Sequence, residues 1–159
     1  MSTAQAIDPA RFRQVLGHVP TGVAVVTAAD GGEPVGLAVG SFCSVSLDPP
    51  LVVFFATKSS STLPRIERAG AFCANVLAED QEDVCRTFAA KGTDRFARLG
   101  WRPGANGAPV LEQALAWVDC TIERVDDAGD HRAVYGRVTD LGTGHEQGPL
   151  VFFRGGYGV

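Results

Sequence analysis

The spacing of apolar residues changes several times along the chain, and each spacing predicts a different element. In residues 8–17 the side chains of Phe12, Val15 and Leu16 recur at helical spacing, between an Asp-Pro pair at one end and a glycine at the other. Aspartate caps helices, proline fits the first helical position, and glycine closes the last turn. This segment therefore predicts a short amphipathic helix.

The next segments favour strands. Residues 22–28 and 35–47 read as two strands joined by the glycine-containing turn 30–34. The run 51–57 is apolar on both faces, and its valine and phenylalanine content favours a buried strand over a helix. Two prolines at 49–50 cannot donate to a strand ladder, so we expect a stiff corner there.

The remaining pattern predicts more strands and two peripheral helices. Further strands are expected at 72–77, 117–125, 131–141 and 150–153, and further helices at 61–70 and 79–89. The strands of 117–141 alternate with period two around an acidic turn, which predicts a hairpin. A strand-rich order with short turns favours a β-barrel or sandwich over a βαβ sheet.

Composition narrows the class of protein. The chain has 159 residues, 45% of them hydrophobic, and no linker, repeat or low-complexity tract divides it, so we expect one domain over 1–159. The longest apolar run, 51–56, is far below the roughly 18 residues that a membrane span needs, and no secretory pattern is present, which predicts a cytoplasmic protein. The net charge of −4 argues against nucleic acid or anionic lipid as a partner.

Metal-binding and nucleophilic side chains are scattered. The cysteines and histidines are Cys43, Cys73, Cys85, Cys120, His18, His131 and His145. None has the spacing of a zinc site or a disulfide framework, so buried free thiols and no metal are expected. A dinucleotide-binding glycine motif is also missing, because residues 142–148 have the wrong spacing and no helix follows, which predicts a loop.

Two segments could bind an anion. Hydroxyl residues at 59–62 precede the second helix, where free backbone N–H groups and side chains could hold a phosphate, with Lys58 adding charge. The alternative is an ordinary N-cap. In residues 88–96, Lys91 and Arg95 bracket a glycine and could close over the same phosphate, although an ordinary helix end explains the pattern equally well.

Several segments together resemble the short-chain flavin reductases, which have the FMN-binding split-barrel fold. They are TGVAVVTA from Thr21, GLAVGSFCSVSLDPPLVVF from Gly36, KSSST from Lys58, FCANVL from Phe72, FAAKGTDRF from Phe88, GAPVLEQALAWVDC from Gly107, GDHRAVYGRV from Gly129 and PLVFFRGGY from Pro149. The resemblance covers nearly the whole chain. One such segment would be weak evidence, but their common order is strong evidence.

The resemblance implies a fold and a function. The fold is mainly β, a Greek-key split β-barrel with a few peripheral α-helices. The function is that of an NAD(P)H:flavin oxidoreductase, which reduces FMN or FAD by hydride transfer from NADH or NADPH and supplies reduced flavin to a partner monooxygenase. A homodimer with the site near the subunit interface is also implied.

The resemblance assigns site residues position by position. Val35, Gly36, Leu37, Ala38, Gly40 and Ser41 line the isoalloxazine, and Phe55, Ala56 and Thr57 lie under the same ring. Ser61, Thr62, Phe88, Ala89, Ala90 and Lys91 contact the phosphate and the ribityl chain. His131, Phe152, Phe153, Arg154, Gly155 and Tyr157 lie where the nicotinamide nucleotide approaches. His131 could instead be a structural turn residue, and Tyr157 a core or dimer contact.

Two positions depart from the family pattern. Ala38 stands where the family usually has threonine, and Gly40 where it often has serine or asparagine, so two potential side-chain donors to the flavin are missing. The alternatives are therefore a non-catalytic flavin- or haem-binding split-barrel protein and an oxidase of the pyridoxamine-phosphate type. No catalytic acid–base pair is expected, because hydride transfer is carried by the cofactors themselves, and Asp48 and Asp130 need not act as bases.

Overall fold

The structure, a computed structural model, describes residues 4–91 and 94–158 and is mainly β. Its helices are α1 (Pro9–Leu16), α2 (Leu63–Ala69) and α3 (Glu82–Ala89). Its strands are β1 (Thr21–Gly22), β2 (Ala24–Asp30), β3 (Glu33–Val39), β4 (Cys43–Ser46), β5 (Leu51–Thr57), β6 (Ala71–Val76), β7 (Trp101–Pro103), β8 (Pro109–Leu111), β9 (Ala116–Ala128), β10 (His131–Thr143), β11 (Val151–Phe153) and β12 (Gly156–Tyr157).

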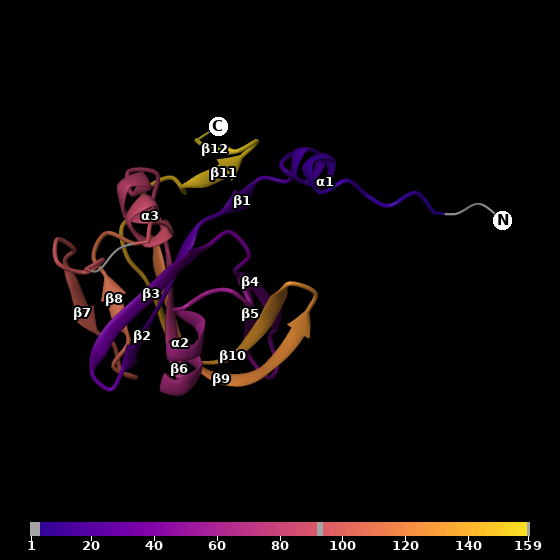
Figure 1. Ribbon diagram of the computed structural model, residues 1–159. Coiled ribbons are helices and arrows are strands. Elements are labelled where there is room, and N and C mark those ends of the chain that lie inside the picture. The colour runs from indigo at the N-terminus through magenta and orange to yellow at the C-terminus, as the bar shows by residue number, and fades with distance from the viewer. Residues whose placement is uncertain (1–3, 92–93, 159) are drawn as a thin grey trace.

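One curved antiparallel sheet carries most of the fold. Its seven strands lie in the order β3-β2-β6-β9-β10-β5-β4 (Figure 1). The β2–β3 hairpin turns at Gly31 and Gly32, whose φ angles of 59° and 86° fall in the left-handed region that favours glycine. Among the described residues, no strand ladder joins the β3 edge to the β4 edge. The predicted split-barrel class is therefore confirmed, as a sheet that curls without closing.

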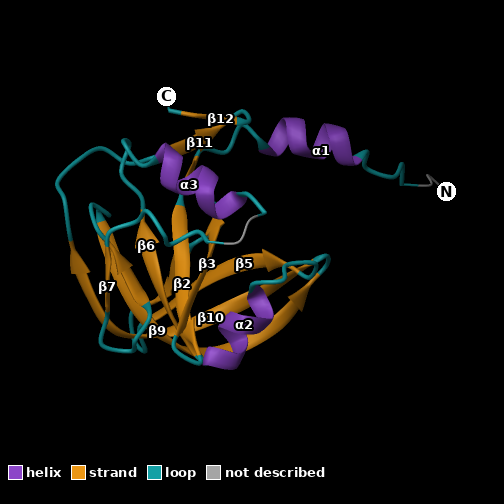
Figure 2. Ribbon diagram, turned by 60° about the vertical axis from the view of Figure 1, so that its left-hand side comes forward, coloured by secondary structure: helices purple, strands orange, loops and turns teal. Residues whose placement is uncertain are grey.

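Two helices cover apolar clusters at different places on this sheet. Leu63 and Ile66 of α2 are buried against a core in which the rings of Phe54 and Phe72 meet edge to face at 5.1 Å. Phe88 of α3 belongs to a second cluster. Figure 2 shows α2 and α3 near opposite ends of the β2–β3 hairpin, so a helix lies close to each end of the outer strand β3.

A small separate sheet pairs the segment after α1 with the C-terminal strands. Its order is β1-β11-β12, and it is continuous with α1 through a hydrogen bond of 2.9 Å from the Arg154 backbone N–H to the Gly17 carbonyl. The predicted first helix is confirmed, with Asp8 Oδ1 accepting from the Ala10 N–H at 3.2 Å. It stands away from the sheets (Figure 1), and none of its residues is buried.

Some element boundaries differ from the sequence prediction. The single strand expected over 35–47 is wrong, because β3 and β4 pair with different neighbours, β2 and β5. The short strands β1, β7, β8 and β12 were not predicted.

Buried free thiols are confirmed for three of the cysteines, but Cys43 is exposed on the outer strand β4. In the described ranges no helix is long and apolar enough to cross a membrane.

Candidate functional site

A cavity of about 910 Å³ opens beside the end of β3. Its walls come from β3, β5, the segment before α2 and the end of α3. The lining residues are Leu37, Ala38, Val39, Gly40, Ser41, Phe55, Ala56, Thr57, Ser59, Ser60, Ser61, Thr62, Phe88, Ala89, Lys91, Arg95 and His131. A volume of this size suits a cofactor-sized ligand.

Most of the predicted flavin residues meet in this cavity. Those brought together are Leu37, Ala38, Gly40, Ser41, Phe55, Ala56, Thr57, Ser61, Thr62, Phe88, Ala89, Lys91 and His131. Val35 and Gly36 line a neighbouring cavity of about 590 Å³, together with Ser61, Thr62 and Arg95. Ala90 is not a lining residue of either cavity, but its carbonyl accepts from Arg95 Nη2 at 2.8 Å.

The hydroxyl of Ser41 links the two sides of the split sheet. Its Oγ donates to the Phe55 carbonyl at 3.1 Å and accepts from the Phe55 N–H at 3.0 Å. β4 pairs with β5 only as far as Val53, so this side chain continues the bonding where the ladder has ended. Ser41 therefore shapes the cavity wall, and its hydroxyl is already engaged within the protein.

At the polar end of the cavity the structure shows the N-cap that was the alternative to an anion site with free backbone amides. Ser60 Oγ accepts from the N–H groups of Thr62 and Leu63 at 3.2 and 3.1 Å, so these two amides are not free for an anion. The hydroxyls of Ser61 and Thr62 face the cavity and make no hydrogen bond within the described residues. The side-chain hydroxyls of Ser61 and Thr62 are thus donors available to a ligand here, whereas the amides of Thr62 and Leu63 are not.

Two cations, Lys91 and Arg95, line the larger cavity, and Arg95 also lines the neighbouring one. The Nη1 of Arg95 donates to the Gly36 carbonyl and its Nη2 to the Ala90 carbonyl, both at 2.8 Å, while its Nε is buried with no partner in the described part of the chain. These bonds tie the segment after α3 to β3. By contrast, Lys58 Nζ lies 3.5 Å from Asp127 on the surface, and it does not line the cavity.

His131 lines the same cavity from the start of β10, where it is paired across the strands with Thr57 and so lies near the segment before α2. Its Nδ1 donates to Asp130 Oδ1 at 2.7 Å, and this hydrogen bond, together with the charge of the imidazolium form, lowers the pKa of the Asp130 carboxyl. The carboxylate fixes the ring so that Nε2 remains available. Both roles proposed for His131, turn residue and nucleotide contact, are compatible with this position.

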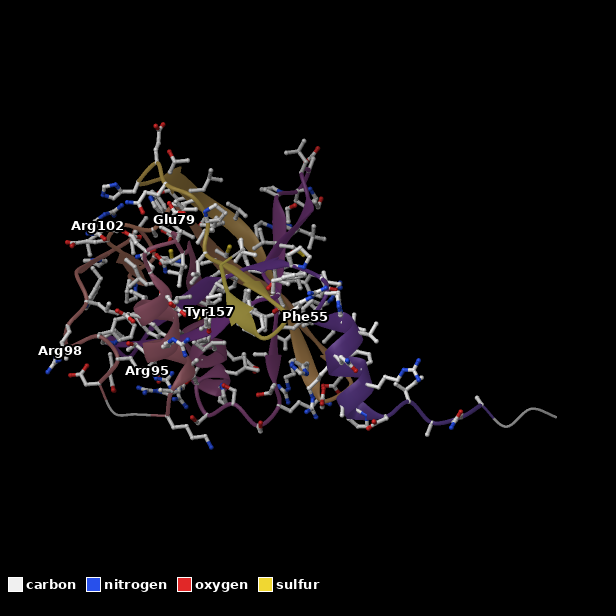
Figure 3. All side chains as sticks on the ribbon, turned by 90° about the horizontal axis from the view of Figure 1, so that it is seen from above. Phe55, Glu79, Arg95, Arg98, Arg102 and Tyr157 are labelled. Atoms are coloured by element: carbon white, nitrogen blue, oxygen red, sulfur yellow. The ribbon has the colours of Figure 1, made fainter. Side chains whose placement is uncertain are left out.

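The residues of 152–157 lie elsewhere. Tyr157 Oη is 3.3 Å from the Sγ of Cys85 on α3, and the guanidinium of Arg86 lies 5.0 Å from the centre of its ring. Figure 3 shows Tyr157 beside α3 and separate from Phe55, and neither cavity is lined by Phe152, Phe153, Arg154, Gly155 or Tyr157. Their assignment to the nicotinamide nucleotide stays a prediction.

Comparison with known proteins decides the family. The model of the flavin reductase like domain matches residues 16–159. The chain belongs to the flavin reductase-like family. A flavin reductase of Pseudomonas putida is 53% identical over 154 residues, which span 96% of this chain and 91% of the relative. The reductase subunit HsaB of a flavin-dependent monooxygenase from Rhodococcus jostii is 49% identical, over 97% of this chain and 79% of the relative.

A solved structure of the same family superposes closely. The NADH:FAD oxidoreductase SgcE6 of Streptomyces globisporus, in complex with NAD and FAD fragments, has a TM-score of 0.91 and 35% identity, over 98% of this chain and 96% of that chain. The split-barrel arrangement of this flavin reductase-like chain is thus shared with a flavin-handling enzyme.

The two departures from the family pattern can now be placed in this flavin reductase-like chain. Ala38 lines the cavity and offers no side-chain donor, and Gly40 lies so close to Thr21 that an added Cβ would be 3.1 Å from its Oγ1. Polar contacts to a flavin ring on this wall must therefore come from the backbone. Within the described ranges no group of His, Cys, Asp and Glu is placed to hold a metal ion.

Proposed function

We propose that the protein is an NAD(P)H:flavin oxidoreductase that reduces FMN or FAD and supplies the reduced flavin to a partner monooxygenase. The observation that carries this proposal is the cavity in which most of the residues expected around a flavin come together from β3, β5, α3 and the segment before α2. The hydride donor is NADH or NADPH, and the acting unit is one domain.

The cavity has the features that flavin binding requires. Apolar side chains of Leu37, Val39 and Phe88 line it, and hydroxyl residues and two cations, Lys91 and Arg95, line it as well and could hold the phosphate. A free hydroxyl pair and an arginine with a buried, unpartnered Nε fit an anionic group. The flavin and the nicotinamide supply the hydride acceptor and donor, and the protein orients them and keeps them dry.

The partner assignment follows from the relatives. The similar protein of Rhodococcus jostii is named as the reductase subunit of a flavin-dependent monooxygenase, and we extend that role to this chain.

The four cysteines of this chain are free thiols, which suits a reducing compartment, and a cytoplasmic location is part of the proposal.

We also propose that the protein is a homodimer. Helix α1 has eight residues, too few for a stable helix on its own in water, and its apolar residues Phe12, Val15 and Leu16 are all exposed. A second copy is the occupant that we assign to this face, because α1 is continuous with the β1-β11-β12 sheet and so could bring the bodies of two chains together.

The deciding experiment is aerobic NADH or NADPH oxidation with and without added FMN, FAD or riboflavin. We expect oxidation only when a flavin is present, because the flavin is the acceptor of the hydride that the nucleotide gives up. Stopped-flow spectra in which flavin binds but neither nucleotide reduces it would instead support a non-catalytic flavin-binding protein.

A further inference from the structure

The two cavities at this site form one path along β3. The larger cavity lies beside residues 37–41, and the smaller one lies beside residues 33–36. They share Ser61, Thr62 and Arg95, so these three residues stand at the junction. Strand β3 spans about 20 Å at roughly 3.3 Å per residue, which is long enough to serve as a common floor for an extended ligand.

The junction is the most favourable place for phosphate groups. Two unengaged hydroxyls and Arg95 line both cavities there, and Arg95 makes no ion pair with a carboxylate among the described residues. Figure 3 shows Arg95 in the segment that follows α3, apart from Tyr157. A partly buried guanidinium whose only partners are carbonyls keeps its positive charge available to an anion.

FMN and FAD differ beyond their first phosphate. The FMN molecule ends at this group, so with its ring in the larger cavity it leaves the smaller cavity empty. This placement moves Val35 and Gly36 from the ring, where the resemblance put them, to the cavity beyond the phosphate. FAD continues through a second phosphate to an adenosine, which would enter the smaller cavity from the junction.

The smaller cavity has the side chains that an adenosine needs. Pro34 and Phe96 offer apolar surface, and the Arg65 guanidinium is held flat by hydrogen bonds of 2.9 Å to Asp30 and to Glu33. A fixed guanidinium plane can stack on an adenine. Glu33 and Asp94 place carboxylates at the rim that can accept from ribose hydroxyls.

We propose that the smaller cavity binds the adenosine half of FAD, so that the protein prefers FAD to FMN, an inference that rests on the function proposed above. The wild-type protein then binds FAD at least about tenfold more tightly than FMN, because only FAD gains the contacts of the second cavity.

Equilibrium titration of FAD, FMN and riboflavin, without any nicotinamide nucleotide, tests this assignment. Glu33→Trp fills the smaller cavity and should weaken FAD about tenfold, while FMN and riboflavin change less than about twofold. The matched control is Glu123→Trp, since Glu123 is also a strand residue paired with an arginine, Arg137, but lies outside both cavities. The control should leave all three affinities unchanged.

A second measurement needs no variant. Millimolar ADP should displace FAD from the wild-type protein but should not displace riboflavin, because ADP fits the junction and the smaller cavity only. Equal affinity for FMN and FAD, equal weakening of both by Glu33→Trp, or failure of ADP to displace FAD would each overturn the proposal. Bound FAD that neither nucleotide reduces would refute the reductase function and leave this assignment standing.

Discussion

His131 lines the cavity, and its ring is held by Asp130, which is not a lining residue. Asp130 accepts from its Nδ1, and the ring is part of the strand end opposite Thr57. The other ring nitrogen is free to bind an amide or phosphate of an incoming nicotinamide nucleotide.

We predict that His131→Ala raises the Michaelis constant for NADH or NADPH about tenfold, equivalent to about 1.4 kcal/mol, with little change in flavin affinity. Steady-state kinetics, flavin titration and a melting curve on one variant measure this. If the variant is stable and its nucleotide kinetics are normal, His131 is not a nucleotide contact. A lower melting temperature with both ligands weakened would identify a structural turn residue.

Asp119 is a second titratable residue with an unusual environment. Both carboxyl oxygens are buried with no hydrogen-bond partner among the described residues, in the wall between β9 and the Gly104 turn. Burial raises the pKa of this carboxyl, and the nearby Asp140 charge adds to the effect. The folded state therefore holds this proton more tightly than the unfolded state does.

Because the folded pKa exceeds the ordinary value of 3.8, the free energy of unfolding should fall as pH rises above that value towards the raised pKa. Asp119→Asn removes this loss, so the variant should gain stability relative to wild type as pH increases from about 4 to 8. Melting curves across this range measure it, with the exposed Asp127→Asn on the same strand as the control. Parallel curves for wild type and Asp119→Asn would show that the carboxyl is ionised in the fold.

At the scale of elements, the contact between the end of β3 and strand β5 shapes the wall of the cavity. Ser41 follows β3 and bonds twice to Phe55 of β5, so one side chain sets the width of the split. Gly36 has a related role on the same strand, because an added Cβ would lie 2.8 Å from Cε1 of Phe88. At this position β3 can approach the Phe88 ring of α3 closely because it has no side chain.

We predict that Ser41→Ala lowers the free energy of unfolding by about 1–2 kcal/mol and weakens flavin binding, because the Phe55 backbone loses both partners. Urea denaturation and flavin titration measure the two effects. Ser44→Ala is the control, since Ser44 is an exposed residue of β4 whose hydroxyl makes no hydrogen bond in the described ranges. Equal stability of the two variants would mean that the link contributes nothing.

The sequence predicted the long elements well and the local contacts poorly. The β9–β10 hairpin was predictable because alternation over many residues reports one buried face. The break at 40–42 was not, because the same alternation continues on both sides and only the choice of partner strand divides it. Strands of two or three residues, such as β1 and β12, are too short to show a period.

The candidate site shows the same division. Residue types at 61–62 and Lys91 indicated an anion site, and the structure brings them to one cavity. The capping of the Thr62 amide by Ser60 was one of the two alternatives that the sequence allowed. The bridge from Arg95 to the Gly36 carbonyl was not predictable, because it joins residues far apart in the sequence through a side-chain direction that no spacing encodes. The place of Tyr157 on α3 likewise depends on the fold of the small sheet.

At the scale of the whole molecule, α1 is an apolar surface without a partner among the described residues. Phe12 is 56% exposed and Leu16 is 47% exposed, although both lie on the apolar face of the helix. Exposed apolar side chains gathered in this way mark interaction surfaces. In the proposed homodimer this helix is the part of each chain that docks on the other.

We predict that the double variant Phe12→Ser, Leu16→Ser is a monomer at micromolar concentration, whereas the wild type is a dimer. Removal of these two side chains deletes most of the apolar area that α1 offers. Sedimentation equilibrium measures the mass, and Arg13→Ser, on the polar face, is the control that should stay dimeric. A monomeric wild-type protein would contradict the assignment.

The link between Ser41 and Phe55 also provides a built-in reporter of motion. A backbone N–H in the middle of a ladder exchanges with solvent only when neighbouring strands separate, but the Phe55 N–H is held by one hydroxyl at the rim of the cavity. Its exchange with deuterium should therefore follow the opening of this wall rather than unfolding of the sheet. Slower deuterium exchange at this one amide would show that a ligand is bound in the cavity, without a dye or probe attached to either molecule.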